Sequence, residues 1–194
     1  MRIDHVILAA ADLDAAAARL EAEHGLIATG GGRHDGIGTE NRIVPLGDGY
    51  LELVGIASAE EAAGSPFGRG VLRRLEEAGD GLLAWVVEVD DVGVVATRLG
   101  TAVTTIARRG LTARLTGVAE AMASPLLPFF LTRDPGVADP GAGADLGGIG
   151  RLELAGDVGR LRDWLGEAGE QLPLAVTPGP PALLAVRVGD RVLR

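Results

Sequence analysis

Two side chains suited to acid–base chemistry or ligand binding fall within predicted strands near the N-terminus. His5 lies in an apolar run over residues 3–10, and Glu52 lies in a second run over residues 50–56. Side chains alternate between the two faces of a strand. If the aliphatic residues of both strands pack on a helix predicted at residues 13–20, His5 and Glu52 share the opposite, open surface. Because a buried carboxylate is costly without a partner, we expect the two to be hydrogen-bonded or ion-paired, either as a structural pair or as part of a pocket.

The elements that would position these residues recur along the chain. An apolar strand run followed by an Asp that can begin a helix occurs ahead of Asp12 and Asp91, and a shorter version occurs ahead of Asp157. Gly25 and Gly100 are placed to end the first two helices. Turn-separated strand candidates follow each helix. The sequence therefore predicts an α+β fold of paired βαβββ modules with a C-terminal βαββ extension.

Composition shifts suggest where these modules begin and end. We expect a first βαβββ module plus a connecting helix over residues 1–80, and a second module over residues 81–134. A stretch rich in Gly and Pro, residues 135–150, is typical of a linker. Residues 151–194 are expected to form a βαββ half-module, a third and shorter copy of the pattern.

The overall composition excludes several kinds of chemistry. The chain has 194 residues, a net charge of −9, no Cys, and 18 basic residues that are all Arg. Without Lys there is no internal Schiff base and no Walker-type phosphate loop, and without Cys there is no thiolate nucleophile or cysteine-bound metal. An acidic chain with few aromatic residues is a poor candidate for binding nucleic acid or a membrane. No apolar run is long enough to span a bilayer, so a cytoplasmic location is the expectation.

Several short motifs, taken in order, resemble the vicinal oxygen chelate superfamily and its glyoxalase-like branch. The motifs, which together cover roughly residues 3–134, are Asp4-His5-Val6-Ile7-Leu8 with Asp12-Leu13-Asp14, Gly38-Thr39-Glu40-Asn41-Arg42-Ile43, Gly49-Tyr50-Leu51-Glu52-Leu53-Val54, Ser65-Pro66-Phe67-Gly68-Arg69, and Pro128-Phe129-Phe130. The resemblance implies two βαβββ modules whose sheets curl around a cleft that often holds a divalent metal ion.

The resemblance also implies ligand positions in the first and last strand of each module. In the first module these positions carry His5 and Glu52, which would be metal ligands, with Glu52 also moving a proton. In the second module they carry Ala84 and, roughly, Thr132, neither of which replaces them. Divalent sites usually need three or more donors. His34 could supply a third donor and complete a two-His, one-carboxylate set.

Other residues are candidates for substrate binding. His34, Asn41, Arg42 and Arg69 could contact oxygen atoms of a ligand, Arg through its bidentate fork; the alternative for both Arg residues and Asn41 is simple surface solvation. The glycine-rich stretch Gly30–Gly38 is interpreted either as a flexible loop or as a lid over the pocket.

The sequence is compatible with three functions. The first is a glyoxalase-type lyase or isomerase that acts on a small oxygen-containing metabolite, with a divalent metal ion as Lewis acid. The second is a metal-free protein that binds or sequesters a small molecule, such as a drug, in the same cleft. The third is an inactive scaffold that forms a homodimer.

Overall fold

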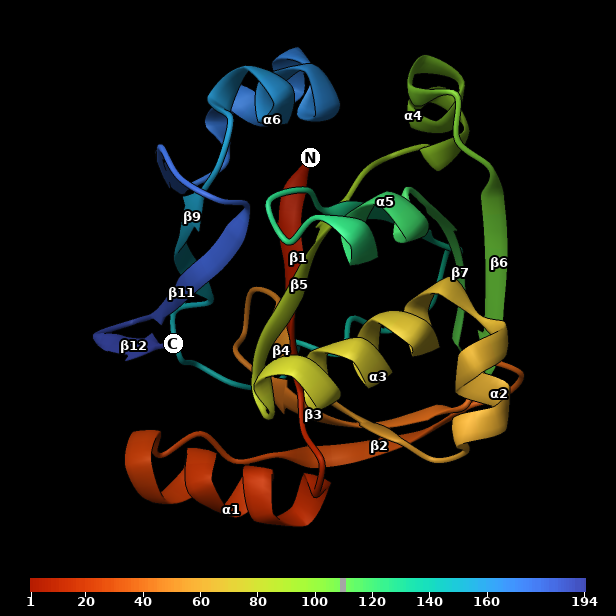
Figure 1. The fold of residues 1–194 in the computed structure, drawn as a ribbon. Coiled ribbons are helices and arrows are strands. Elements are labelled where there is room, and N and C mark those ends of the chain that lie inside the picture. Colours follow the sequence, from red (N-terminus) through yellow and green to blue (C-terminus); the bar gives the residue numbers. More distant parts are fainter. Residues whose placement is uncertain (109–110) are drawn as a thin grey trace.

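An eight-stranded sheet forms the centre of the protein, in a computed structural model that describes residues 1–108 and 111–194 (Figure 1). Its strand order is β2-β3-β4-β1-β5-β8-β7-β6. The first half comprises β1 (Arg2–Ala9), α1 (Leu13–His24), β2 (Thr29–His34), β3 (Thr39–Pro45) and β4 (Tyr50–Ile56). The second half comprises β5 (Gly81–Glu88), α4 (Val92–Leu99), β6 (Val103–Arg108), β7 (Leu111–Thr116), α5 (Val118–Ala123) and β8 (Phe129–Arg133). The predicted pairing of βαβββ modules is confirmed, with α5 inserted before the last strand.

The two halves join through their first strands. Strands β1 and β5 run antiparallel at the centre of the sheet, and each also pairs in parallel with the last strand of its own half, β4 or β8. Each first strand therefore lies directly beside the last strand of its own half. In the first half, this pairing brings His5 and Glu52 close together.

The helix starts expected from the sequence are confirmed. The carboxylates of Asp12, Asp91 and Asp157 each accept a hydrogen bond from a backbone N–H in the first turn of α1, α4 and α6 (Val158–Leu165) respectively. Gly25 and Gly100 end α1 and α4 in the left-handed conformation, which glycine adopts without steric cost.

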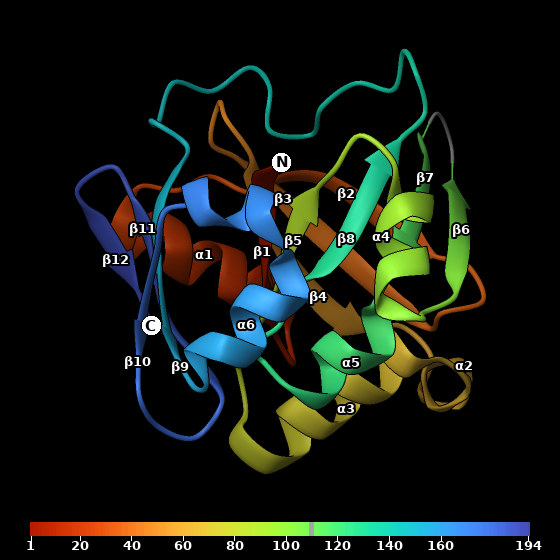
Figure 2. The same cartoon turned by 90° about the horizontal axis from the view of Figure 1, so that it is seen from above.

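Helices cover both faces of the large sheet. On one face α1, α4 and α6 pack into the main hydrophobic core together with the C-terminal strands. On the other face α3 (Pro66–Ala78) and α5 pack over a smaller apolar cluster, and α2 (Ala59–Gly64) lies beside α3 (Figures 1 and 2). This second face also contains the cavity described below.

A β-bulge in β1 corrects one detail of the predicted alternation. The pairing of β1 with β5 shifts between Ile3 and His5, so Asp4 has no partner of its own in the register. Ile3 consequently lies in the main core with Val6, although strict alternation would have placed it on the face of His5. The bulge leaves the Asp4 side chain beside the His5 ring rather than on the opposite face.

The C-terminal unit differs from the expected third copy. It comprises β9 (Ile149–Ala155), α6, a 3-10 turn (Glu167–Gln171), β10 (Leu174–Thr177), β11 (Ala182–Val188) and β12 (Arg191–Leu193), with strand order β10-β9-β11-β12. Here the first strand lies between the second and the third, whereas in the other two units it lies next to the last. The strand β12 was also not expected. In Figure 1 this unit, in blue, lies beside the central strands, and its apolar residues extend the main core.

The segment between β8 and β9, residues 134–148, contains no helix or strand but packs closely on the first half. The backbone N–H of Gly47 donates to the carbonyl of Gly141, and the Asp139 carboxylate accepts from Arg2 at 2.7 Å. No described helix combines the length and apolar character that a membrane crossing requires.

Candidate functional site

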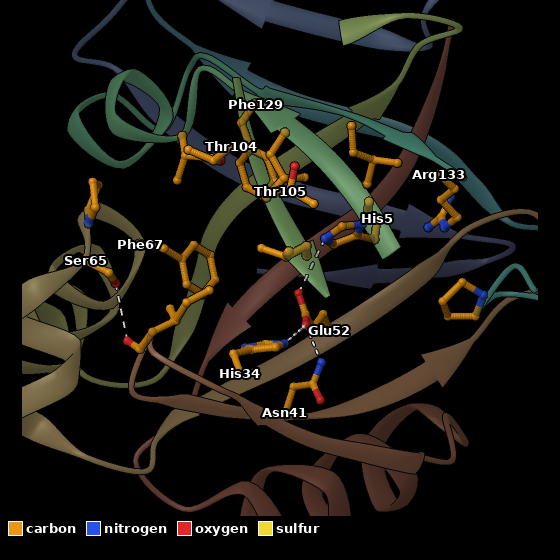
Figure 3. A pocket seen from close by; sticks show the side chains of 18 of the residues that line it. His5, His34, Asn41, Glu52, Ser65, Phe67, Thr104, Thr105, Phe129 and Arg133 are labelled. Carbon is orange, nitrogen blue, oxygen red and sulfur yellow. Dashed lines mark hydrogen bonds and ion pairs between the residues drawn. The ribbon is translucent and has the colours of Figure 1, made fainter. Parts of the chain in front are cut away.

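A cavity of about 520 Å³ opens on the second face of the large sheet. Both halves of the sheet, the start of α3 and the segment before β9 contribute to its wall. Most of the wall is apolar, and four polar side chains gather at one end. Figure 3 shows this end, where His34, Asn41, Glu52 and His5 point toward one another.

The carboxylate of Glu52 is the centre of the polar end. The Asn41 side-chain amide donates to its Oε1 atom, and Nε2 of His34 lies 3.5 Å from the same oxygen. Nε2 of His5 lies 3.4 Å from Oε2. Nδ1 of His34 in turn lies 2.8 Å from the Thr39 hydroxyl oxygen. The prediction that His5 and Glu52 share one surface is confirmed.

A second carboxylate fixes the other side of the His5 ring. Nδ1 of His5 lies 2.6 Å from Oδ2 of Asp4, whose side chain is completely buried. Arg133, from β8, donates to both oxygens of Asp4, at 2.6 and 2.7 Å, and to Glu88 at 3.0 Å. Such a bidentate contact fixes the orientation of both groups. The second half of the sheet thus contributes a cation that holds the first half's histidine in place.

These contacts set the ionisation of the buried groups. Burial opposes the charged form of Glu52, but the hydrogen bond and charge of His5, with His34 and Asn41, lower its pKa to about 2. Burial likewise opposes ionisation of Asp4, yet His5 and Arg133 lower the pKa of Asp4 well below its usual range. The pKa of His5 is raised in spite of its burial, because carboxylates face both ring nitrogens.

Aromatic rings surround the polar end. The Tyr50 ring stacks on His5, with centroids 4.4 Å apart. Phe129 meets His5 edge to face, and Phe67, at the start of α3, meets both Phe129 and His34 in the same way. Ser65, the N-cap of α3, donates its hydroxyl to the carbonyl of Ile37, which ties the start of α3 to the loop after β2. The cavity therefore combines an ionised carboxylate with a predominantly aromatic and aliphatic wall.

Two of the predicted binding residues do not reach this cavity, which corrects the sequence interpretation. Arg42 follows Asn41 in β3 and so lies on the opposite face, where it donates to Asp14 at 3.1 Å. Arg69 lies on the exposed side of α3 and donates to the carbonyl of Ala63 at 3.0 Å. His34 and Asn41 do line the cavity.

The donor set does not fit the metal site that the family resemblance implies. Among the described residues, no group of three His, Cys, Asp or Glu side chains is arranged to hold a metal ion. Thr132, the expected counterpart of Glu52, faces away from the cavity and bonds to the backbone of Val89 and Val92. The cavity wall on β8 is formed instead by Phe129, Leu131 and Arg133, which have no metal-binding donor.

Several residues of this site could not be found from the sequence. Strict alternation places Asp4 on the face opposite His5, because the bulge has no signal in the sequence. Arg133 meets Asp4 across 129 positions, and only the paired topology brings them together. Phe67 and Phe129 are part of the family motifs, but the motifs did not indicate that their rings line the cavity.

Comparison with known proteins agrees with this architecture. The sequence model of a glyoxalase-like domain matches residues 3–159. A methylmalonyl-CoA epimerase solved with methylmalonyl-CoA and NH₄⁺ is 21% identical, with a TM-score of 0.55 over 72% of this chain and 98% of its own. A single-residue variant of the Streptomyces coelicolor methylmalonyl-CoA epimerase, in complex with 2-nitronate-propionyl-CoA, is 21% identical, with a TM-score of 0.54 over 68% of this chain and 96% of its own.

A hypothetical protein from Staphylococcus aureus resembles the whole chain. It is 12% identical, with a TM-score of 0.71 over 98% of this chain and 97% of its own, so its fold includes a counterpart of the C-terminal unit. No curated protein matches the sequence significantly. At these identities the solved structures establish the fold alone.

Replacing Arg133 should destabilise the protein strongly. Arg133→Met leaves the buried Asp4 carboxylate without its bidentate partner, and breaking a buried pair in this way typically costs about 3–5 kcal/mol. Urea unfolding followed by circular dichroism measures the loss. Arg187→Met, which removes a half-exposed contact with Glu153 at 2.9 Å, should cost no more than about 1 kcal/mol. Equal losses in the two variants would contradict the role assigned to Arg133.

Glu52 should make folding sensitive to acid. Its pKa in the folded protein, about 2, lies below the ordinary value of 4.5, so its ionised form stabilises the protein above about pH 5. That stabilisation is lost as the pH falls toward about 2. Urea unfolding at a series of pH values should show a shallower acid-side loss in Glu52→Gln than in the wild type. Glu153→Gln is the control, and the prediction is wrong if it changes the slope as much.

Proposed function

The chain belongs to the glyoxalase-like domain family, and on that premise we propose that it binds a small oxygen-containing molecule in the cavity of its large sheet. The observation that supports this most directly is the position of Glu52, a buried, ionised carboxylate at the polar end of a predominantly apolar cavity. The cavity volume lies within the range of small-molecule sites, which typically combine an apolar wall with a few converging polar groups.

The energetics of the polar end also support a binding role. Buried ion pairs are a weak source of stability, because the cost of removing two charges from water offsets their attraction. Asp4, His5, Glu52 and Arg133 are nevertheless all at least nine-tenths shielded from solvent. A cluster that stabilises the fold little more than apolar side chains of the same volume would, and that opens onto a cavity, is better explained by recognition of a ligand.

A ligand of this cavity should stabilise the folded protein by mass action. A thermal-shift screen of small oxygen-containing metabolites and drugs is expected to find compounds that raise the Tm by several degrees. The shift should be lost in Thr105→Trp, which places a large side chain at an exposed position on the cavity wall. Thr97→Trp, exposed on α4 and absent from that wall, is the matched control.

The outcomes of that screen separate the possibilities. Shifts that survive Thr105→Trp would place binding elsewhere on the protein and contradict the proposal, as would a broad screen without any shift. Repeating the screen with a chelator tests the role of metal ions. The poor fit of the donor set predicts that the shifts persist after chelation.

An isomerase-type reaction is the second candidate, and the contact of Glu52 with two imidazole groups favours it. A carboxylate between imidazoles can exchange protons with a bound carbon acid. The low pKa of Glu52 makes it a weak base in the ligand-free protein, so binding ranks first. A ligand that separates Glu52 from His5 would remove the largest stabilisation of the ionised form and raise the basicity of Glu52.

Proton exchange tests this second candidate without knowledge of the product. A stabilising ligand with a C–H bond next to a carbonyl should incorporate deuterium in D₂O in the presence of the protein, as measured by NMR. Glu52→Gln should reduce the rate at least about hundredfold, the usual scale for losing an acid–base group. Unchanged exchange in Glu52→Gln would rule out this role for Glu52, whereas the binding proposal would stand.

A further inference from the structure

The polar end of the cavity is built as a closed circuit of rings around one carboxylate. His34 meets Phe67 with centroids 6.4 Å apart, Phe67 meets Phe129 at 6.4 Å, and Phe129 meets His5 at 6.3 Å. The carboxylate of Glu52 then joins His5 back to His34, at 3.4 and 3.5 Å. Figure 3 shows these five side chains facing one another around the end of the cavity.

All three ring–ring contacts are edge to face, with interplanar angles of 79°, 81° and 82°. Edge-to-face contacts between aromatic rings are favourable beyond the burial of apolar area. Such an arrangement of side chains can accommodate one further flat ring from a ligand. That ring would make edge-to-face contacts with several of the aromatic side chains at once. A flexible aliphatic chain would fill the space but would lose more conformational freedom and gain no such contacts.

The carboxylate restricts which ring fits. An ionised carboxylate only accepts hydrogen bonds. The described partner of Oε2 of Glu52 is Nε2 of His5 at 3.4 Å, which is longer than the 2.7–2.9 Å of a good charge-assisted bond. The long contact with His5 therefore leaves this oxygen able to accept a stronger hydrogen bond from a ligand. An anionic group placed there would meet the charge of Glu52 and be repelled.

Building on the proposed function, we infer that the ligand class of this cavity is a compact aromatic molecule that carries a hydroxyl or N–H donor. Its ring would lie among Phe67, Phe129 and the two imidazoles, and its donor would bond to Oε2 of Glu52. The remaining volume, lined by aliphatic residues such as Ile106, Leu115 and Leu131, would accommodate a short apolar substituent.

Three molecules that share an ethyl-substituted benzene ring test this inference on the wild-type protein. The probes are 4-ethylphenol, which has the donor, 4-ethylanisole, which lacks it, and 4-ethylbenzoate, which is anionic. NMR titration at pH 7 should show 4-ethylphenol binding at least about tenfold more tightly than 4-ethylanisole, the usual scale for a hydrogen bond to a charged group. No binding of 4-ethylbenzoate is expected.

Two variants locate the site. Phe67→Leu should weaken binding of both 4-ethylphenol and 4-ethylanisole, because it removes one ring of the circuit. Glu52→Gln should bring the two affinities close together, because the amide is a poorer acceptor than the carboxylate. Glu153→Gln, at a partly exposed carboxylate outside the cavity, should change neither affinity.

Each outcome bears on the inference. Equal affinity of 4-ethylphenol and 4-ethylanisole, or tighter binding of 4-ethylbenzoate, would overturn it and leave the proposed cavity function intact. The same holds if none of the three binds while other compounds show Thr105-dependent stabilisation. If no compound of any kind binds, the proposed function fails together with the inference.

Discussion

The site depends on one interaction, the bidentate contact between Arg133 and Asp4. It joins the last strand of the second half to the first strand of the first half, at 2.6 and 2.7 Å. With Arg133 in place, the Asp4 carboxylate remains ionised and holds Nδ1 of His5, which directs Nε2 toward Glu52. The orientation of the His5 ring is therefore set by a residue on the other half of the sheet.

The two halves of the sheet therefore have different roles in the site. The first half contributes the polar residues His5, His34 and Glu52, whereas Phe129 and Leu131 of the second half contribute apolar wall. A symmetric pair of modules could place donors from both halves around an ion. Here the second half contributes the guanidinium of Arg133, which is bound to Asp4 and brings a positive charge close to His5.

The parts of the fold that follow from local periodicity could be predicted from the sequence. Alternation placed Glu52 and His5 on one surface, and the Asp caps located the helix starts at Asp12, Asp91 and Asp157. The predictions fail where a local rule is broken or where tertiary contacts determine the arrangement of the strands. The bulge at Asp4 breaks the alternation, and the strand order of the C-terminal unit depends on packing against the main core.

The low pKa of Glu52 bears on whether this carboxylate binds a ligand or acts as a base. A general base works best when its pKa lies near the working pH, but the donors around Glu52 favour its ionised form strongly. The same donors make the carboxylate a fixed acceptor that requires no reorganisation when a ligand arrives, which is the property of a recognition group. Catalysis at this position would need a ligand that breaks the contact with His5 on binding. Asp4 and Arg133 hold the His5 ring from the other side. The contact between Glu52 and His5 would therefore have to break through movement of Glu52.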